Sequence, residues 1–186
     1  MSLDTLKTQL GDYAKDTKLN LSKVLSEEGS PDLSLTQIHT TALASAYATK
    51  EPSVIATIEA ETSTLSPEYV QAARAAATIM GMNNVYYRFV HLTEDKDYGK
   101  MPANLRMQVI GNPGIPKVDF ELMSLAVSAI NGCGMCMDSH AGVLTQSGIS
   151  KTGVQSAVRI AAVLASAAQA LAIAGYGKPL QSAQAA

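Results

Sequence analysis

Two cysteines and a histidine in the second half of the chain have residue types and spacing suited to redox chemistry. Cys133 and Cys136 are the only cysteines in the 186 residues, and two residues separate them. Thiols at this spacing can close into a disulfide and open again. His140 follows Cys136 by four residues, one helical turn, so it could accept the thiol proton and later return it. The pattern indicates a thiol redox centre.

A glutamate upstream of the cysteines could orient that histidine. Glu121 lies in the run FELMSLAVSAI, where almost every neighbour is apolar. A carboxylate buried there would be costly without a partner or a function. The Asn131-Gly132 pair that follows is a predicted helix break. A reversal at this point could place Glu121 against His140, and the two could then share a proton near neutral pH.

Other roles for these residues stay open from the sequence alone. Cys133, Cys136 and His140 are three ligands of the type that binds zinc, although no fourth ligand at a matching spacing is evident. The cysteines could instead be inert core thiols. His140 could be a satisfied helix histidine, and Glu121 a partly exposed structural acid.

The composition predicts that helices position these residues, in an all-α fold. Hydrophobic residues make up 47% of the chain but aromatic residues only 5%, so the apolar mass is mainly Ala, Leu, Val, Ile and Met. Most of these favour helices. No segment alternates with the period of a strand. The length fits one domain over residues 1–186.

Apolar periodicity and capping residues predict where the helices lie. The run that carries Glu121 is expected to be a buried helix, and the CxxC motif is expected to open the next one. Ser66 and Ser150 are expected to cap the two long helices. A short helix is expected to end near Gly11 and to be followed by an irregular arm to residue 25. Residues 83–116 are expected to form loops around one or two short helices, and Gly177 and Pro179 are expected to stop the last helix. The other expected helices are 33–49, 51–62, about 66–82, 119–130, the CxxC helix, and 150 to about 175.

The sequence also predicts a helical bundle built from two similar halves, at about residues 33–90 and 117–175. Short runs of small residues match between them, as in ALASAYAT from Ala42 and LAVSAING from Leu125. In this register the first half carries Lys, Ser and Thr where the second half carries the two cysteines and His140. Only the second half would therefore hold the redox residues.

The net charge and the first residues of the chain indicate which partners the protein is not expected to bind and where in the cell it is expected to lie. A net charge of −2 gives no long-range attraction for nucleic acid or an anionic membrane. The start, MSLDTLK, lacks the basic and apolar regions of a secretory signal, and no run of about 18 consecutive apolar residues is present. We therefore expect a cytoplasmic protein, where a CxxC pair is more often redox-active or metal-binding than structural.

These residues resemble the alkylhydroperoxidase D family, within the wider carboxymuconolactone decarboxylase-like fold. The resemblance rests on Glu121, on the run FELMSLAVSAINGC leading into Cys133, and on Cys136 and His140. It extends to SLDTLK, YAKD and KLNL near the start of the chain, and so covers essentially the whole sequence. It implies an all-helical two-repeat fold, assembled as a homotrimer or a multiple of trimers.

The resemblance also implies an activity and its partners. The expected protein is a peroxidase without a bound cofactor that takes electrons from dihydrolipoamide, the reduced lipoyl group of a lipoylated acyltransferase protein. It is expected to act on hydroperoxides and to reduce a partner peroxiredoxin, alkyl hydroperoxide reductase C.

Roles for the site residues follow from the same resemblance. Cys136 is implied to attack the peroxide and become a sulfenic acid, and Cys133 to resolve it and to donate a proton to the leaving oxygen. Glu121 and His140 are implied to form the proton relay. Some family members have a further histidine just before the second cysteine, where this chain has Met135, and a thioether cannot relay a proton.

Three functions are compatible with the sequence. The expected one is an antioxidant thiol peroxidase. A second is a disulfide reductase or adaptor, whose main client is another protein's disulfide and whose own peroxide turnover is slow. A third is a metal-binding or purely structural helical protein. Lactone decarboxylation is not expected, because the decarboxylases that share the fold lack this thiol pair.

Overall fold

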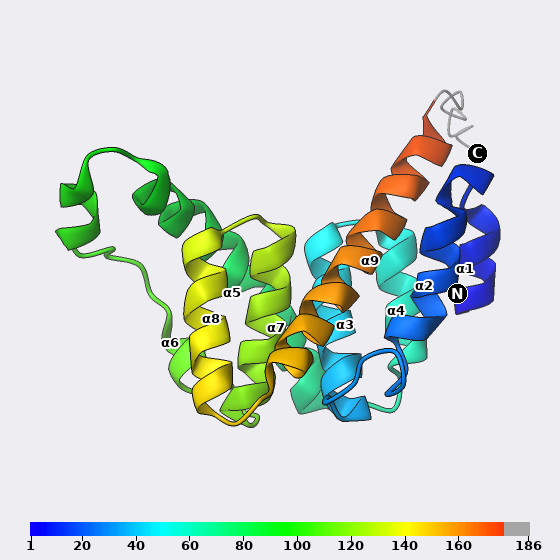
Figure 1. Ribbon diagram of the computed structural model, residues 1–186, viewed down its shortest axis with the longest axis horizontal. Coiled ribbons are helices and arrows are strands. Elements are labelled where there is room, and N and C mark those ends of the chain that lie inside the picture. The colour runs from blue at the N-terminus through cyan, green and yellow to red at the C-terminus, as the bar shows by residue number, and fades with distance from the viewer. Residues whose placement is uncertain (177–186) are drawn as a thin grey trace, which may run out of the picture.

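The computed structural model describes residues 1–176 and forms nine α-helices, with no strand among these residues (Figure 1). The prediction of an all-α protein is confirmed. The helices are α1 (Leu3–Gln9), α2 (Lys15–Val24), α3 (Leu35–Thr49), α4 (Pro52–Glu61), α5 (Pro67–Leu92), α6 (Gln108–Gly111), α7 (Lys117–Ile130), α8 (Gly134–Gln146) and α9 (Lys151–Gly175), with 3-10 turns η1 (Asp12–Ala14) and η2 (Lys96–Lys100).

Helices α3 and α7 form the centre of the bundle. Helix α3 packs against α5, α7 and α9, and α7 also packs against α5, α8 and α9. Every residue of α7 from Asp119 to Ser128 is buried. The prediction of a buried helix ahead of the cysteines is therefore confirmed, and this helix is a rigid support for Glu121.

A tight reversal joins α7 to α8, as the Asn131-Gly132 pair predicts. Asn131 is the C-cap residue of α7. Gly132 has a φ of +69°, in the left-handed region that glycine adopts without steric cost. The reversal lays α8 alongside α7, and Figure 1 shows the two helices side by side.

The two predicted caps differ in the structure. Ser150 caps α9, because its side chain accepts a hydrogen bond from the backbone N–H of Gly153. Ser66 occupies the N-cap position of α5, but its side chain makes no capping bond there. Its hydroxyl instead donates to Glu68 Oε2 at 2.6 Å. The prediction of a hydroxyl cap is therefore wrong for Ser66.

The expected irregular arm near the N-terminus is wrong, because this segment forms η1 and α2. Leu21 and Val24 of α2 are buried, and α2 packs against α9. Lysines and polar residues occupy most other positions of the segment, so its local apolar signal is weak. Contact with α9, far along the chain, stabilises the helix.

The expected end of α5 near Met82 is also wrong, because the helix continues to Leu92. Residues 83–92 contain no glycine or proline, but they begin with two asparagines, which are poor helix formers. The structure gives both asparagines buried positions against α7 and α8. Figure 1 shows the chain beyond α5, with η2, projecting beside the bundle before it returns to α6.

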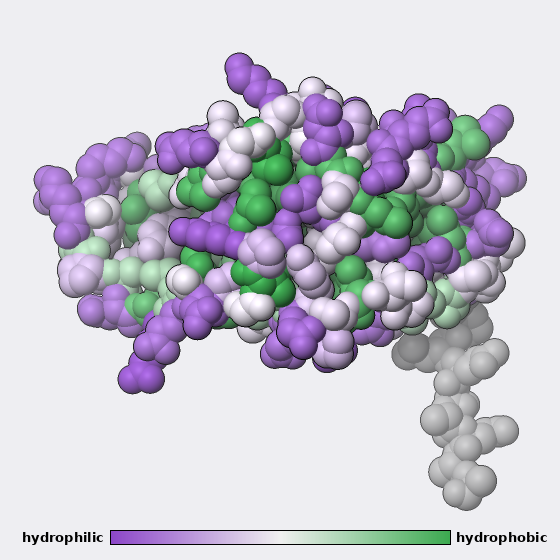
Figure 2. All heavy atoms as spheres, turned by 90° about the horizontal axis from the view of Figure 1, so that it is seen from below, coloured by the Kyte–Doolittle hydropathy of each residue, from purple (hydrophilic) through white to green (hydrophobic). Residues whose placement is uncertain are grey.

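Helix α9 is long and apolar enough, by length and composition alone, to cross a membrane. In this structure it packs against α2, α3 and α7, and 33% of its most apolar stretch is buried. Figure 2 shows that hydrophobic and hydrophilic side chains are interspersed on the face seen from below. The predicted stop signals of this helix, Gly177 and Pro179, lie outside the described residues.

The order of helix lengths is similar in the two predicted halves. Helices α3, α4 and α5 have 15, 10 and 26 residues, and α7, α8 and α9 have 14, 13 and 25. The duplication and the single-domain organisation stay predictions.

Candidate active site

The α7–α8 reversal places the two cysteines at the start of α8. Cys133 is the N-cap residue of α8, one position before the helical turn in which it was expected. Its backbone N–H donates to the Ser128 carbonyl at 3.1 Å. Its Sγ accepts a hydrogen bond from the backbone N–H of Cys136 at 3.3 Å. A thiolate at this position is stabilised by that amide and by the positive end of the helix dipole.

Cys133 and Cys136 form a disulfide, with 5.3 Å between their Cα atoms. The prediction that the pair can close into a disulfide is confirmed. The two cysteines differ in their surroundings: Cys133 is fully buried, whereas Cys136 is 6% exposed and lines a cavity. A small molecule in the cavity therefore meets Cys136 and not Cys133.

Glu121 and His140 are in direct contact, as predicted from the helix break between them. Glu121 Oε2 lies 2.6 Å from His140 Nδ1, and both side chains are almost completely buried. A neutral imidazole that donates its Nδ1–H to the carboxylate keeps Nε2 as an acceptor. The carboxylate therefore selects the tautomer in which His140 can take a proton.

A cavity of about 370 Å³ joins Cys136, His140 and Glu121. Most of its wall is apolar and comes from α5, α6 and α8. This combination of an apolar wall and a few polar groups is typical of small-molecule sites. The apolar wall consists of Met80, Tyr87, Met107, Ile110, Met135 and Val143.

Comparison with known proteins shows the family of the chain. An alkyl hydroperoxide reductase AhpD from Coxiella burnetii (strain Dugway 5J108-111) is 58% identical over 171 residues, which are 90% of this chain and 95% of that protein. The chain belongs to the AhpD family. Proteins of the same name from Azorhizobium caulinodans and Maricaulis maris are 53% and 55% identical, over 96% and 92% of this chain and 98% of each relative.

The family model named carboxymuconolactone decarboxylase family matches residues 96–178. The matched range contains Glu121, Cys133, Cys136 and His140. The predicted resemblance to the alkylhydroperoxidase D family within the carboxymuconolactone decarboxylase-like fold is therefore confirmed.

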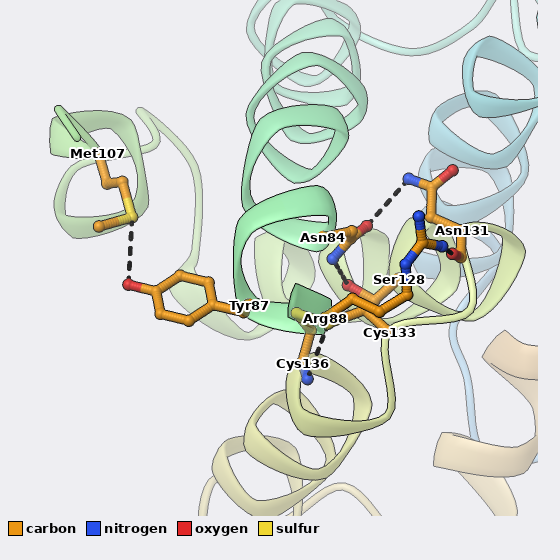
Figure 3. The surroundings of a disulfide bond; sticks show 8 residues. All are labelled: Asn84, Tyr87, Arg88, Met107, Ser128, Asn131, Cys133 and Cys136. Carbon is orange, nitrogen blue, oxygen red and sulfur yellow. Dashed lines mark hydrogen bonds between the residues drawn. A yellow bond between two sulfur atoms is a disulfide. The ribbon is translucent and has the colours of Figure 1, made fainter. Parts of the chain in front are cut away.

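A second polar network holds the CxxC turn of this AhpD-family chain (Figure 3). Asn84 Nδ2 donates to Ser128 Oγ at 2.9 Å, and Asn131 Nδ2 donates to Asn84 Oδ1 at 2.9 Å. Arg88 Nη1 donates to the Asn131 carbonyl at 2.7 Å. The network fixes the end of α7 next to Cys133.

Sequence reasoning missed this network and most of the cavity wall, including its polar residues Asn83 and Ser139. Asn83, the neighbour of Asn84 on α5, lines the cavity that contains Cys136. Two adjacent asparagines inside a helix are a local signal, since asparagine is a poor helix former. The partners of Asn84 lie more than 40 residues away in the sequence, so the two asparagines alone do not indicate which residues they contact.

The zinc-type ligand set of the sequence does not form a cluster in this structure. Among residues 1–176, no group of three or more His, Cys, Asp or Glu side chains is placed to hold a metal ion. The two cysteines are bonded to each other, and His140 Nδ1 is occupied by Glu121.

Proposed function

We propose that the protein is an antioxidant thiol peroxidase that reduces organic hydroperoxides through Cys133 and Cys136. One observation carries the proposal: a largely apolar cavity reaches Cys136 beside the buried Glu121–His140 pair. An apolar wall suits the alkyl group of a hydroperoxide, and a thiol next to a positioned base suits attack on its oxygen. Relatives named alkyl hydroperoxide reductase AhpD support the same activity.

The first step oxidises Cys136. In the dithiol form, His140 Nε2 accepts the Cys136 proton, and Glu121 stabilises the resulting imidazolium. The thiolate attacks the terminal oxygen of the hydroperoxide, so that an S–O bond forms as the O–O bond breaks. The alkyl-bearing oxygen receives the bonding electron pair and leaves as an alcohol, with a proton from the Cys133 thiol. Cys136 becomes a sulfenic acid.

The second step forms the disulfide. The Cys133 thiolate attacks the sulfur of the sulfenic acid, and hydroxide leaves with the proton held by His140, as water. The N-cap position of Cys133 favours this step, because the Cys136 amide and the helix dipole stabilise its thiolate. Overall, two thiols and one hydroperoxide give one disulfide, one alcohol and one water.

We further propose that a dithiol reductant resets the site. Dihydrolipoamide, carried by a lipoylated acyltransferase protein, is a dithiol on a largely apolar chain, and the same cavity offers it a route to Cys136. Besides the hydroperoxide, the reduced CxxC pair is proposed to pass electrons to a peroxiredoxin, alkyl hydroperoxide reductase C. A cytoplasmic location and assembly into a homotrimer or a multiple of trimers belong to the same proposal.

Peroxide consumption by the purified full chain tests this function. The reaction contains dihydrolipoamide and tert-butyl hydroperoxide but no peroxiredoxin, with Cys136→Ser as the matched control. A peroxidase consumes peroxide catalytically, and the variant does not. Consumption that starts only when peroxiredoxin is added would identify an adaptor. Stoichiometric zinc, with no thiol oxidation under peroxide, would identify a metal-binding protein.

A further inference from the structure

Asn83 is a buried polar side chain whose position is not explained by folding. It is 4% exposed, and its Oδ1 is buried without a hydrogen-bond partner. A buried amide oxygen without a partner lowers the stability of the fold, and asparagine inside a helix lowers it further. An apolar side chain of similar size would suit this part of α5 better.

The neighbouring asparagine shows what a structural amide looks like in this fold. Asn84 is equally buried, but its Nδ2 and Oδ1 both have partners, Ser128 and Asn131. Asn83 lies about 100° further round α5 and lines the cavity, and its Oδ1 has no hydrogen-bond partner. The two asparagines therefore have different roles, although they are adjacent.

Helix geometry directs Asn83 into the cavity. Met80, Asn83 and Tyr87 are spaced by three and four residues, so they share one face of α5, and all three line the cavity. On the facing helices, Glu121 and His140 Nδ1 are committed to each other. Asn83 and Cys136 therefore line the same cavity, and the buried Asn83 Oδ1 has no hydrogen-bond partner in the protein.

We propose that Asn83 is a substrate-binding residue that donates a hydrogen bond from Nδ2 to the alkyl-bearing oxygen of the hydroperoxide. The inference rests on the proposed peroxidase function. As the Cys136 thiolate bonds to the terminal oxygen, the alkyl-bearing oxygen gains the electron pair of the breaking O–O bond. A donor in a largely apolar cavity stabilises this developing charge strongly.

The amide group suits this role better than a charged or apolar side chain. Rotation about the last side-chain torsion of asparagine is soft, so the NH₂ group can turn toward a ligand. A cationic side chain would form an ion pair with the Cys136 thiolate, whereas a neutral amide does not. The amide also keeps its own protons, so the proton that the alcohol needs still comes from Cys133. This placement lowers the stability of the fold, because it leaves the buried Oδ1 without a hydrogen-bond partner.

Asn83→Leu tests the proposal, with Asn83→Ala as a second variant should the leucine disturb packing. We expect oxidation of Cys136 by tert-butyl hydroperoxide to slow by about 10²-fold, as for loss of one donor to a developing oxyanion. Alkylation of Cys136 by iodoacetamide, which has no such leaving oxygen, is expected to keep its rate and pH profile. Asn83→Asp, which keeps the shape but loses the donor, is expected to slow peroxide oxidation as well.

Two further readouts separate a substrate contact from a structural role. Across hydroperoxides whose alcohols differ in acidity, the rate of Asn83→Leu is expected to fall more steeply for the poorer leaving groups. In thermal unfolding, Asn83→Leu should match or exceed the wild-type midpoint, whereas Asn84→Leu should unfold at a lower temperature.

The proposal is overturned if Asn83→Leu and Asn83→Ala oxidise at the wild-type rate, or if alkylation slows as much as oxidation. In either case the proposed peroxidase function still stands, provided that the wild-type protein reduces hydroperoxides. If the wild-type protein itself fails to react with hydroperoxides, the proposed function fails and this inference fails with it.

Discussion

Glu121 on α7 and His140 on α8 lie 2.6 Å apart, Oε2 to Nδ1, with side chains only 4% and 11% exposed. The contact joins two helices across the turn that carries the cysteines. It explains why a carboxylate is tolerated in a helix whose residues are buried over ten consecutive positions. We interpret the pair as the base that prepares the Cys136 thiolate.

Replacing the carboxylate tests this interpretation. Glu121→Gln should keep the fold, because glutamine is similar in shape and can still bond His140 Nδ1. It cannot carry the charge that stabilises an imidazolium. Peroxide turnover is therefore expected to slow by about 10²-fold or more, with a changed pH–rate profile. Wild-type turnover across roughly pH 6–8, the range around the ordinary histidine pKa, would make Glu121 structural only.

Asp119 provides a matched control two residues earlier on the same helix. It is also buried, but its oxygens accept from Gln37 Nε2 at 2.9 Å and from the Tyr69 hydroxyl at 2.8 Å. Asp119→Asn is expected to lower the urea midpoint and to leave the pH–rate profile unchanged. The same kinetic loss in both variants would mean that any buried acid of α7 matters only for stability.

The exposure of the two cysteines predicts which is oxidised first. Only Cys136 lines the cavity, whereas Cys133 is fully buried. In Cys133→Ser, a dimedone-type probe should label Cys136 after one equivalent of hydroperoxide, because no thiol is left to resolve the sulfenic acid. Labelling confined to Cys133 in the reciprocal Cys136→Ser protein would reverse the assigned roles.

Asn84 is expected to matter for stability. Asn84→Ala removes two hydrogen bonds and leaves the buried Ser128 hydroxyl and the Asn131 amide without a partner. The free energy of unfolding, from urea titration followed by circular dichroism, is expected to fall by about 1–3 kcal/mol. An unchanged midpoint would show that water or local rearrangement replaces the network.

The disulfide and the Glu121–His140 contact were predictable from the sequence, because these residues lie close together along the chain. The spacing of Cys133, Cys136 and His140 lies within one helical segment, and an acid in an apolar run is conspicuous. The Asn131-Gly132 break then indicates the reversal that brings Glu121 to the histidine. Little more than helix geometry is needed for these steps.

Features that depend on distant contacts were not predictable in the same way. Helix α2 is stabilised by packing on α9, and α5 packs against α7, α8 and η2. Asn83 lines a cavity whose wall includes Met107 of the distant segment before α6. Local propensity does not contain such information.

The lowered pKa of His39 is expected to make the protein less stable in mild acid. Burial on α3 holds the pKa of His39 below its ordinary value, and the Glu61 carboxylate offsets part of this effect. The unfolded chain then takes up the proton at a higher pH than the folded chain does. Stability is therefore complete above the ordinary pKa of about 6.5 and falls as the pH drops through that value.

His39→Gln removes this source of acid sensitivity. Urea midpoints at about pH 7.5 and 5.5 should differ less for the variant than for the wild-type protein. Equal differences in the two proteins would mean that His39 contributes nothing to the acid response.

Reaction of the reduced protein with one equivalent of tert-butyl hydroperoxide tests the central claim most directly. Mass spectrometry and thiol alkylation follow the protein, and chromatography follows the alcohol. The account predicts stoichiometric alcohol and a protein that has lost two hydrogens, with Cys133 and Cys136 joined and unreactive until a dithiol is added. Two thiols that remain fully alkylatable after exposure to the peroxide, with no alcohol formed, would contradict it.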